Sequence, residues 1–412
     1  MIETKFKKSE VGLIPEDWEV KPIGSVADIL NGSTPPTANP KNYGTTHLFV
    51  SPADLGDSKY IENTIKKLST IGFSMSRIIP KGSILYTCTG STIGKCGIAF
   101  CDLTSNQQIN AVLPNGSYNN EYLYYAIQTR ESDIRSNASV QAVPLINKTT
   151  FSKTLVAFPQ KTEQSRIAEA LSDMDDLIAI TKKLIEKKRN IKEGAMQDLL
   201  SGKRRLPGFN EKWVSKKIDD IGYTYNGLSG KSKEDFGTGN AKYITFLNVL
   251  NNPIIDTSIF EKVVIHPNER QNEARNGDLF FNTSSETPDE VGICACLLED
   301  IKDLFLNSFC FGFRLSDKEI DSLFMAYLWR SRKGRDIMTM LAQGSTRFNL
   351  SKSLLRNTSI EIPQTKEEQQ AIAQVLSDMD SEIQSLEVRL TKYQFLKQGM
   401  MQQLLTGKIR LI

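Results

Sequence analysis

The stretch Leu171-Ser172-Asp173-Met174-Asp175 recurs without change as Leu376-Ser377-Asp378-Met379-Asp380, 205 residues further along a chain of 412 residues. The same offset relates Glu163-Gln164 to Glu368-Gln369, and it also relates residues 196–203 to residues 401–408. Because one offset fits all three matches, the two stretches align without a gap. An internal repeat defines an architecture more strongly than any local signal. We therefore expect two copies of one unit.

Each repeated stretch predicts a long helix. Residues 162–200 contain no proline and a single glycine, and apolar residues recur three or four positions apart, which is typical of a coiled-coil seam. In the first copy we assign the seam to Ile167, Leu171, Met174, Ile178, Leu184, Ile191, Ala195 and Leu199. In the second copy we assign it to Ile372, Leu376, Met379, Ile383, Leu386, Leu390, Tyr393, Leu396, Met400 and Leu404. Gly202 and Gly407 predict the helix ends.

About 40 helical residues span roughly 60 Å, far more than an average helix. We expect an antiparallel pair that acts as a spacer, and the alternative is that each helix packs only on its own domain. Leu386→Pro should then break the helix and abolish the activity of the assembled protein. A lysine-rich run lies between Lys182 and Lys192, and it fits either a solvated helix face or a contact with an anionic partner.

The segments before the helices repeat more faintly. Trp18 corresponds to Trp213, and Asn31-Gly32 corresponds to Asn226-Gly227. Short runs rich in β-formers alternate with turns and short helices, which indicates an α+β fold. We divide the chain into a globular domain at 1–160, a helix at 161–203, a second domain at 204–362 and a second helix at 363–412. Since residues 405–411 resemble residues 200–206, which run on into the second domain, we expect adjacent termini and a pseudo-twofold internal repeat.

Composition excludes several classes of protein. The chain has 51 basic and 48 acidic residues, a weak excess that neither requires nor forbids a DNA partner. No apolar run approaches the roughly 20 residues that span a bilayer, and residues 1–10 lack a signal-type apolar segment, so we expect a cytoplasmic protein without membrane contact. Six cysteines show no Cys-x-x-Cys spacing and only two histidines are present, so we expect buried, reduced thiols and no metal.

Two segments resemble enzyme motifs without completing them. Thr89–Cys96 resembles a phosphate-binding loop, but it lacks the first glycine and has Cys96 where Ser or Thr is needed. Phe236-Gly237-Thr238-Gly239 resembles half of an adenosylmethionine loop, and no catalytic tetrapeptide follows it. No Ser/His/Asp or Cys/His set is evident, so we expect a protein that is not an enzyme.

Loops rich in Ser, Thr, Asn and Gln offer hydrogen-bonding groups for phosphates and base edges, although each is also compatible with an ordinary turn. The candidate DNA contacts are Ser33, Thr34, Ser91, Thr92, Lys95, Gln107, Gln141, Lys231, Ser284, Ser285, Gln343 and Arg347. The candidate partner contacts on the helices are Leu171, Met174, Ile178, Leu376, Met379 and Ile383.

Over nearly its whole length the chain resembles the specificity subunits of type I restriction–modification enzymes. The resemblance rests on Phe158-Pro159 with Gln164, on Ile362-Pro363 with Gln369, on the Leu-Leu-Ser/Thr-Gly-Lys helix ends and on Gly12–Trp18 before a variable domain. It implies two target recognition domains joined by antiparallel helices, each domain reading one half of an asymmetric, bipartite double-stranded DNA site.

The resemblance also implies partners. Two methylation subunits would dock on the helices, carry adenosylmethionine and methylate adenine, and ATP-driven restriction subunits would join them, so this chain itself would need no cofactor. Two other readings stay open from the residues alone. One is a two-domain protein-binding scaffold with a coiled-coil spacer, and the other is a fused methyltransferase or nuclease fragment.

Overall fold

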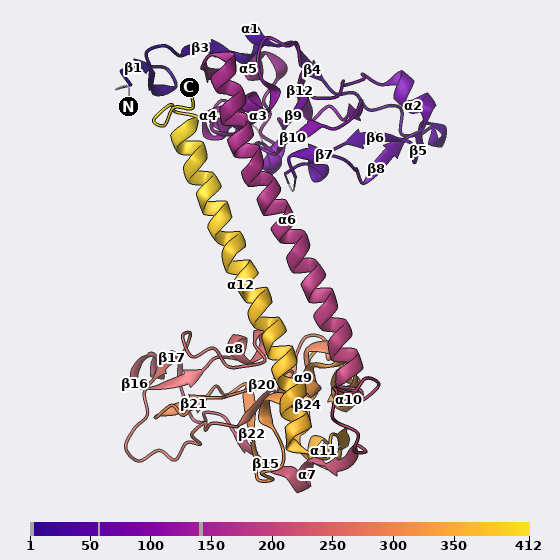
Figure 1. Ribbon diagram of the computed structural model, residues 1–412, viewed down its shortest axis with the longest axis vertical. Helices are drawn as coiled ribbons and strands as arrows, with labels where there is room; N and C mark the ends of the chain where they lie inside the picture. Colours follow the sequence, from indigo (N-terminus) through magenta and orange to yellow (C-terminus); the bar gives the residue numbers. More distant parts are fainter. Residues whose placement is uncertain (1–3, 57, 140–142) are drawn as a thin grey trace. The chain divides into compact units, whose positions relative to one another are not determined.

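The structure, a computed structural model, describes residues 4–56, 58–139 and 143–412. Its contacts divide the chain into two compact units (Figure 1). Unit 1 comprises Met1–Leu184 and Leu386–Ile412, and unit 2 comprises Ile185–Ser385. Each unit therefore contains one globular domain, the beginning of the helix that follows it, and the end of the other long helix.

Two sheets form the domain of unit 1. The central sheet has the order β4-β12-β9-β10-β7, in which only the β10–β7 pair is parallel. Its strands are β4 (Ile29–Asn31), β12 (Ile109–Val112), β9 (Ile84–Thr87), β10 (Cys96–Ala99) and β7 (Tyr60–Ile61). The second sheet has the order β11-β6-β8-β5, with β11 (Thr104–Ser105), β6 (His47–Val50), β8 (Lys66–Leu68) and β5 (Tyr43–Gly44). All four residues of β9 and all four residues of β12 are buried, so both faces of these two strands are covered.

Unit 2 repeats this connectivity. Its central sheet is β15-β22-β18-β20, formed by β15 (Gly222–Asn226), β22 (Cys310–Leu315), β18 (Leu279–Asn282) and β20 (Cys294–Cys296). A parallel bridge between Ile254 and Cys296 stands where β7 pairs with β10 in unit 1. Its second sheet is β17-β16-β21, with β17 (Glu261–Val263), β16 (Phe236–Ile244) and β21 (Leu304–Leu306). The repeat predicted from faint sequence matches is thus confirmed in strand order.

In both units the strand that enters the domain pairs with the strand that leaves it. β3 (Glu19–Pro22) is antiparallel to β13 (Leu155–Phe158), and β14 (Val214–Lys217) is antiparallel to β25 (Ser359–Ile362). A hairpin of β1 (Phe6–Ser9) and β2 (Gly12–Pro15) precedes β3 in unit 1. The short helices are α1 (Ile23–Val26), α2 (Thr70–Met75), α4 (Glu131–Ser136), α5 (Lys148–Ser152), α7 (Ile218–Ile221), α8 (Phe246–Asn251), α10 (Arg332–Leu341) and α11 (Lys352–Asn357).

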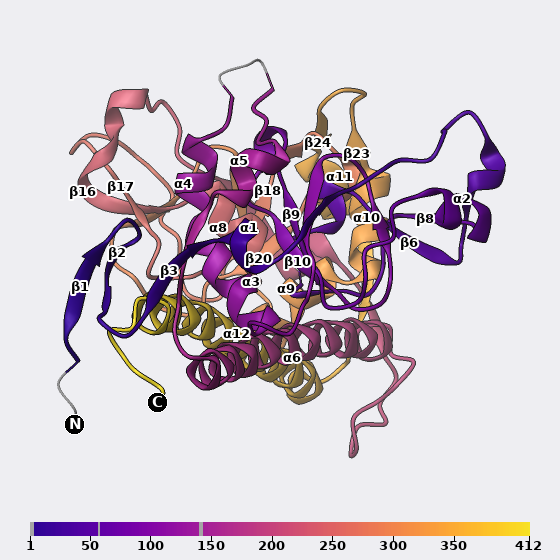
Figure 2. The ribbon, with the colours of Figure 1, turned by 90° about the horizontal axis from the view of Figure 1, so that it is seen from above.

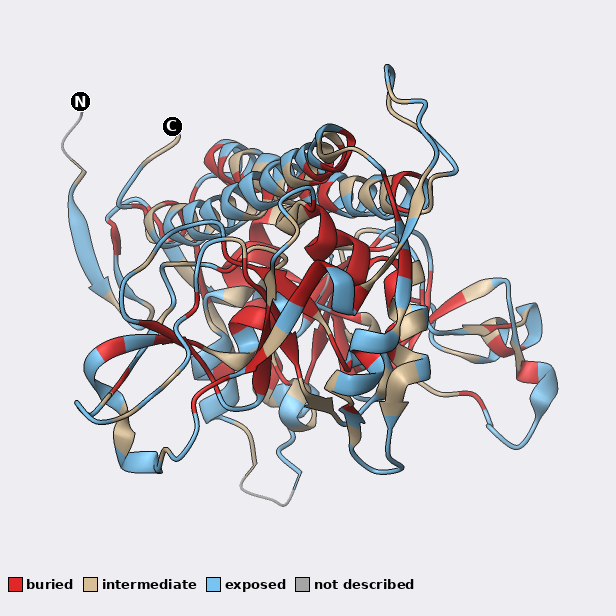
Figure 3. Ribbon diagram, turned by 90° about the horizontal axis from the view of Figure 1, so that it is seen from below, coloured by how far each residue is buried: buried red, intermediate tan, exposed pale blue. Residues whose placement is uncertain are grey.

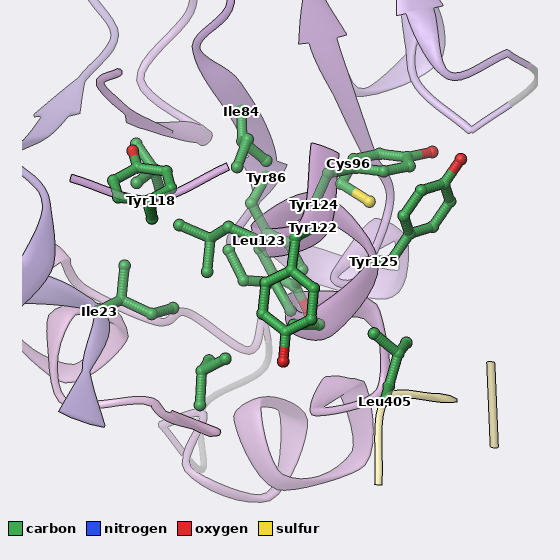
Figure 4. Close-up of a cluster of buried hydrophobic side chains, with 14 of the residues drawn as sticks. Ile23, Ile84, Tyr86, Cys96, Tyr118, Tyr122, Leu123, Tyr124, Tyr125 and Leu405 are labelled. Atoms are coloured by element: carbon green, nitrogen blue, oxygen red, sulfur yellow. The ribbon is translucent and has the colours of Figure 1, made fainter. Parts of the chain in front are cut away.

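One helix lies at the centre of each core. The short helices expected in the two domains include α3 (Asn120–Gln128) and α9 (Ser322–Arg330). Asn119 and Asp321 cap them by accepting hydrogen bonds from Tyr122 N and Phe324 N at 2.9 and 2.8 Å. Both helices are apolar on nearly every side, and such helices are buried. Figure 4 shows the aromatic side chains of α3 among strand residues and beside Leu405, which lies near the end of the chain.

The two long helices are α6 (Lys161–Leu199) and α12 (Lys366–Leu404). Gln164 and Gln369 fasten their first turns, because each side-chain oxygen accepts a 2.9 Å hydrogen bond from the backbone that leads into α3 or α9. The same amides donate to Pro159 O and Pro363 O at 2.9 and 3.0 Å. After the last turns, Gly202 and Gly407 adopt φ of 72° and 68°, the left-handed conformation that commonly terminates helices.

Within each unit the two helices run antiparallel. In unit 1, Asp175 opposes Lys397 at 2.7 Å and Glu163 opposes Arg410 at 2.7 Å, so residue numbers rise on α6 as they fall along α12. In unit 2, Lys188 meets Glu382 at 2.6 Å, and Arg205 meets Glu368 at 2.6 Å. Figures 1 and 2 show α6 and α12 beside one another. The predicted antiparallel coiled coil is confirmed, and the two chain termini belong to the same unit.

The predicted seam is wrong at three positions. Leu184, Ile191 and Leu396 are 37, 46 and 51% exposed, whereas Ile185 is buried and Lys192 and Lys397 are largely covered. In α6 the inward-facing positions therefore continue at seven-residue intervals: Leu171, Ile185 and Leu199 are buried, and Ile178 and Lys192 are partly covered. At Ile191 and Leu396 the predicted seam is shifted by one position because the true seam residues, Lys192 and Lys397, are charged and meet aspartates of the facing helix. At Leu184 two neighbouring apolar residues compete, and Ile185 is the buried one.

The cysteine prediction is correct for five thiols and wrong for one. Cys88, Cys96, Cys294, Cys296 and Cys310 are buried and unpaired, and burial raises the pKa of Cys88 and Cys310 to about 12. Cys101 is exposed because it follows the end of β10 in a bend. Figure 3 shows that buried residues follow the strands and the helix faces packed on them. Among the described residues, no group of His, Cys, Asp and Glu is arranged to hold a metal ion.

Candidate nucleic-acid interface

Strand direction brings most of the candidate loops to one end of each central sheet. In unit 1, β4 and β9 end where β12 begins, because β12 is antiparallel to both. In unit 2, β15 and β18 end where β22 begins, for the same reason. We call these two places the reading edges. Loops that were separate in the sequence, including those around Gln107 and Ser91, therefore share one end of the sheet.

An Asn-Gly pair forms the centre of each reading edge. A Cβ atom on Gly32 would lie 2.1 Å from Asn106 O, and one on Gly227 would lie 2.0 Å from Asn307 O, so only glycine permits the close backbone approach. The preceding asparagines are held by cations: Arg77 Nη1 donates to Asn31 O at 3.0 Å, and Lys352 donates to Asn226 Oδ1. Neither cation was predicted from the sequence, since both lie far along the chain from the asparagine they contact.

Three of the predicted residues meet at the reading edge of unit 1. Thr34 Oγ1 donates to Gln107 Oε1 at 2.6 Å, and Ser33 Oγ accepts from Arg77 N at 2.8 Å. Asn31 Nδ2 donates to Gln107 O at 3.0 Å, which fixes the turn that presents this glutamine. The edge is therefore an ordered array of amide and hydroxyl groups, with Gln107 exposed and Ser33 and Thr34 half-buried. Such groups can form hydrogen bonds with base edges.

A tight turn next to β9 forms the second part of this edge. Ser91 and Lys95 are exposed and Thr92 is partly covered, and Thr92 Oγ1 donates to Thr89 O at 3.1 Å. Gly90 N donates to Pro144 O at 2.8 Å, which places this turn against the segment around residue 144. Gln141 lies outside the described residues. A phosphate-binding loop leads into an α-helix. Here the turn leads into strand β10 instead, so the structure does not support that resemblance.

The reading edge of unit 2 carries a projecting hairpin. Ser284 and Ser285 form β19, which pairs with β24 (Phe348–Leu350), and β24 pairs in turn with β23 (Ala342–Gln343). The structure thus brings together two candidate loops, one containing Ser284 and Ser285 and the other containing Gln343 and Arg347. The tip between β23 and β24 is exposed, and Gly344 adopts φ of 135° where a Cβ would lie 2.1 Å from Arg347 O.

Lys231 departs from the prediction. Its side chain is 2% exposed, and its ammonium donates to Val264 O at 2.5 Å and to Glu269 at 2.7 Å. The ammonium is held by the Glu269 carboxylate in the loop that follows β17, so it does not offer the exposed cation that a phosphate contact needs. Lys352 takes its place among the cations of this edge: it lies 5.3 Å from the centre of the Phe311 ring, and burial lowers its pKa.

The partner contacts predicted on the helices need a similar correction. Leu171 and Leu376 are fully buried and Ile383 is 7% exposed, while Met174, Ile178 and Met379 are partly covered by the same packing. These side chains form the seam and the contact with the unit's own domain, so they are not offered to another protein. A different set of apolar residues faces solvent in unit 1. We call it the outer stripe: Leu177, Ile180 and Leu184 on α6, with Val388 and Phe395 on α12.

No helix within residues 4–56, 58–139 and 143–412 combines the length and the apolar character needed to cross a membrane.

Comparisons with a family model and with known proteins agree on one protein family. A family model described as type I restriction modification DNA specificity domain matches twice, at residues 15–187 and 210–392. The chain is 26% identical to the type I restriction enzyme MjaVIII specificity subunit of Methanocaldococcus jannaschii, covering 99% of this chain and 96% of that protein. It is 34% identical to the MjaIX specificity subunit of the same organism, over 44% of this chain and 43% of that one.

Solved structures show the same fold. The S subunit of a type I restriction–modification system from M. genitalium superposes with a TM-score of 0.60, at 17% identity, covering 98% of this chain and 99% of that one. A second structure, from a study of complex assembly in the type I system, gives a TM-score of 0.59 at 14% identity over 96% of this chain. Similar folds at such low identity leave the individual base contacts to be read from this chain's own residues.

Proposed function

Because this chain belongs to the type I restriction–modification DNA specificity family, we propose that it selects the DNA sequence on which a multisubunit methyltransferase and endonuclease acts. Each domain reads one half of an asymmetric, bipartite site in double-stranded DNA, and the paired helices set the unread gap. One observation carries this proposal. The two units share strand order and an Asn-Gly reading edge, yet they present different side chains there.

Shared scaffolds with different surfaces suit two ligands of one kind. The edge of unit 1 offers Thr34 and Gln107, whose amide and hydroxyl groups suit adenine and phosphate contacts. The edge of unit 2 offers Arg347 and Gln343 on an exposed hairpin, and a guanidinium suits the two acceptors of guanine in the major groove. We therefore expect the two half-sites to differ in sequence, and the site as a whole to be asymmetric.

The chemistry is assigned to partners. Two methylation subunits supply adenosylmethionine and modify adenine, and restriction subunits supply ATP-driven cleavage. The chain itself acts without catalysis or a bound cofactor. Contiguous exposed apolar patches mark protein contacts, and Leu177, Ile180 and Leu184 recur at three- and four-residue spacing along α6. We therefore assign the methylation-subunit contact in unit 1 to the outer stripe rather than to the buried seam.

A methylation map tests the proposal. The chain is co-expressed with its methylation subunit in a host free of adenine methylation, and modified adenines are located by sequencing. A two-part motif with one fixed gap, absent when this chain is omitted, is the expected result. Identical methylation without the chain, or none despite a stable complex, would overturn the proposal in favour of a scaffold without sequence preference.

A further inference from the structure

Two lysines interrupt the apolar seam at equivalent places. Lys192 and Lys397 are separated by the repeat offset, and their side chains are only 19 and 18% exposed. They occupy the seven-residue series that otherwise contains leucine and isoleucine in α6, and the matching series in α12. A charged residue at such a position weakens packing, and it persists where it specifies how the helices pair.

Each lysine meets an aspartate of the facing helix and a tyrosine of the domain. In unit 1, Lys397 contacts Asp175 at 2.7 Å, Tyr125 OH donates to Asp175 Oδ2 at 2.6 Å, and Lys397 Nζ lies 5.3 Å from the centre of the Tyr125 ring. We call this set a seam node. It joins three elements at one point, namely α12, α6 and the central helix α3.

Unit 2 contains the same seam node. Lys192 pairs with Asp380, Tyr327 OH donates to Asp380 Oδ2 at 2.8 Å, and Lys192 Nζ lies 5.6 Å from the centre of the Tyr327 ring. The aspartates are the last residues of the repeated Leu-Ser-Asp-Met-Asp stretch. Both copies of the repeat keep this geometry although their domains differ in sequence, which indicates a requirement of the architecture rather than a chance surface ion pair.

If one helix slid along the other by one heptad, the apolar seam and the nodes would be affected differently. Apolar residues that repeat every seven positions meet apolar residues again after such a shift. Neither direction of shift restores both ion pairs. In one direction Lys397 and Lys192 would oppose Ala168 and Ala373, which are both 2% exposed, and would be buried without a partner. In the other direction Lys192 would oppose Glu387, but Lys397 would oppose Lys182, a like charge, so one of the two nodes is still lost.

We propose that Lys192 and Lys397 are positioning residues that select the register of the helix pair and hold each recognition domain on it through Tyr327 and Tyr125. This inference rests on the proposed function for its consequence, which is that the two nodes determine the gap between half-sites. One heptad corresponds to about 10 Å along a helix, or about three base pairs of DNA. The nodes therefore exclude sites whose gap differs by that amount.

Charge reversal with charge-swap rescue tests the inference. The variant Lys192→Glu/Lys397→Glu places like charges in both nodes, and adding Asp175→Lys and Asp380→Lys restores opposite charges. Lys187→Glu/Lys392→Glu is the matched control, because these exposed lysines are also separated by the repeat offset and carry the same change of charge. Register is measured by the distance between spin labels at Asp173→Cys and Gly399→Cys in a Cys101→Ser background, since both labelled sites are exposed and belong to unit 1.

We expect one narrow label distance in the parent and in the control, a shifted or broadened distance after charge reversal, and recovery in the charge-swapped variant. In the methylation map, charge reversal should reduce methylation at the parental gap at least tenfold or introduce a second gap, and the swap should restore it. An unchanged label distance after charge reversal would overturn the register assignment. A changed label distance with an unchanged gap in the methylation map would overturn the link between helix register and site selection. If the parent shows no bipartite motif, the proposed function is overturned, and the label distances still test the register assignment separately.

Discussion

Arg410 donates two hydrogen bonds to Glu163, with Nε–Oε1 and Nη2–Oε2 distances of 2.7 and 2.9 Å, so the last residues of the chain complete the domain built by its first residues. Arg205 makes the same pair with Glu368 at 2.6 and 2.6 Å, within the segment that links α6 to the second domain. The segment around Arg410 and the linker around Arg205 thus contain the same structural motif, a bidentate Arg–Glu pair. In unit 1, Arg410 also holds the pKa of Asp17 below its usual value through a side-chain hydrogen bond.

Replacing Arg410 by alanine should destabilise unit 1 selectively. Glu163 has a side chain that is 4% exposed, so it would be left as a buried charge without its partner. Breaking a buried pair from one side costs about 3–5 kcal/mol. The measurement is urea unfolding followed by hydrogen exchange of α3 and α9, which should show loss of protection in α3 alone. Lys408→Ala, an exposed neighbour, serves as the control, and equal loss from both variants would show that the pair is not responsible.

Adding a methyl group to Gly32 should damage one half-site only. The new Cβ would lie 2.1 Å from Asn106 O, so the backbone of the reading edge has to move, at a cost of about 1–3 kcal/mol. Gly32→Ala should therefore relax the sequence requirement in one half of the methylated motif, and Gly227→Ala should relax it in the other half. Gly194→Ala is the control, since nothing lies within 4 Å of its added Cβ. Loss of both halves from either variant would contradict separate reading by the two units.

The sequence predicted the repeat, the long helices and their antiparallel pairing because these depend on periodic patterns that a single chain displays. It placed Ile191 in the seam, where the structure has Lys192, because hydrophobicity alone cannot show that Lys192 finds Asp380 on the facing helix. It placed Leu184 there instead of Ile185 because two adjacent apolar residues fit the same spacing. It missed Arg77 and Lys352 for a related reason. Their role depends on asparagines 46 and 126 positions away, and no local pattern records such a contact.

Lowering the pH should reduce the stability of unit 1, because protonation of Glu121 removes a stabilising charge. Burial alone would raise the pKa of this carboxyl, but hydrogen bonds from Ser172 and Tyr60 and the nearby Lys59 ammonium outweigh it and lower the pKa below its usual value. A group with a depressed folded-state pKa stabilises the fold above its unfolded pKa, and this contribution is lost as pH falls through the folded pKa.

The place of Glu121 is taken by Leu323 in unit 2, where the corresponding contacts are apolar. Glu121→Leu should therefore remove part of the acid sensitivity of unit 1. Thermal unfolding of the full chain between neutral and acidic pH measures this, with Glu10→Leu as an exposed control. An acid-induced loss of stability that is the same in the parent and in Glu121→Leu would show that another carboxyl is responsible.

The outer stripe should determine whether a methylation subunit binds. Ile180 and Leu184 are 63 and 37% exposed, and unlike Leu171 they contribute little to the packing of their own unit. Ile180→Glu/Leu184→Glu should leave the unfolding transition of the chain within about 0.5 kcal/mol of the parent, as surface substitutions usually do. It should weaken binding of the purified methylation subunit at least tenfold, or about 1.4 kcal/mol, because two charges would have to be desolvated in the interface.

Titration calorimetry measures the affinity. Asn190→Asp/Gln197→Glu adds the same two negative charges at exposed positions of the same helix and should bind normally. Normal binding by the stripe variant as well would place the contact on another face, and weakened binding by both variants would point to long-range charge rather than to the apolar stripe.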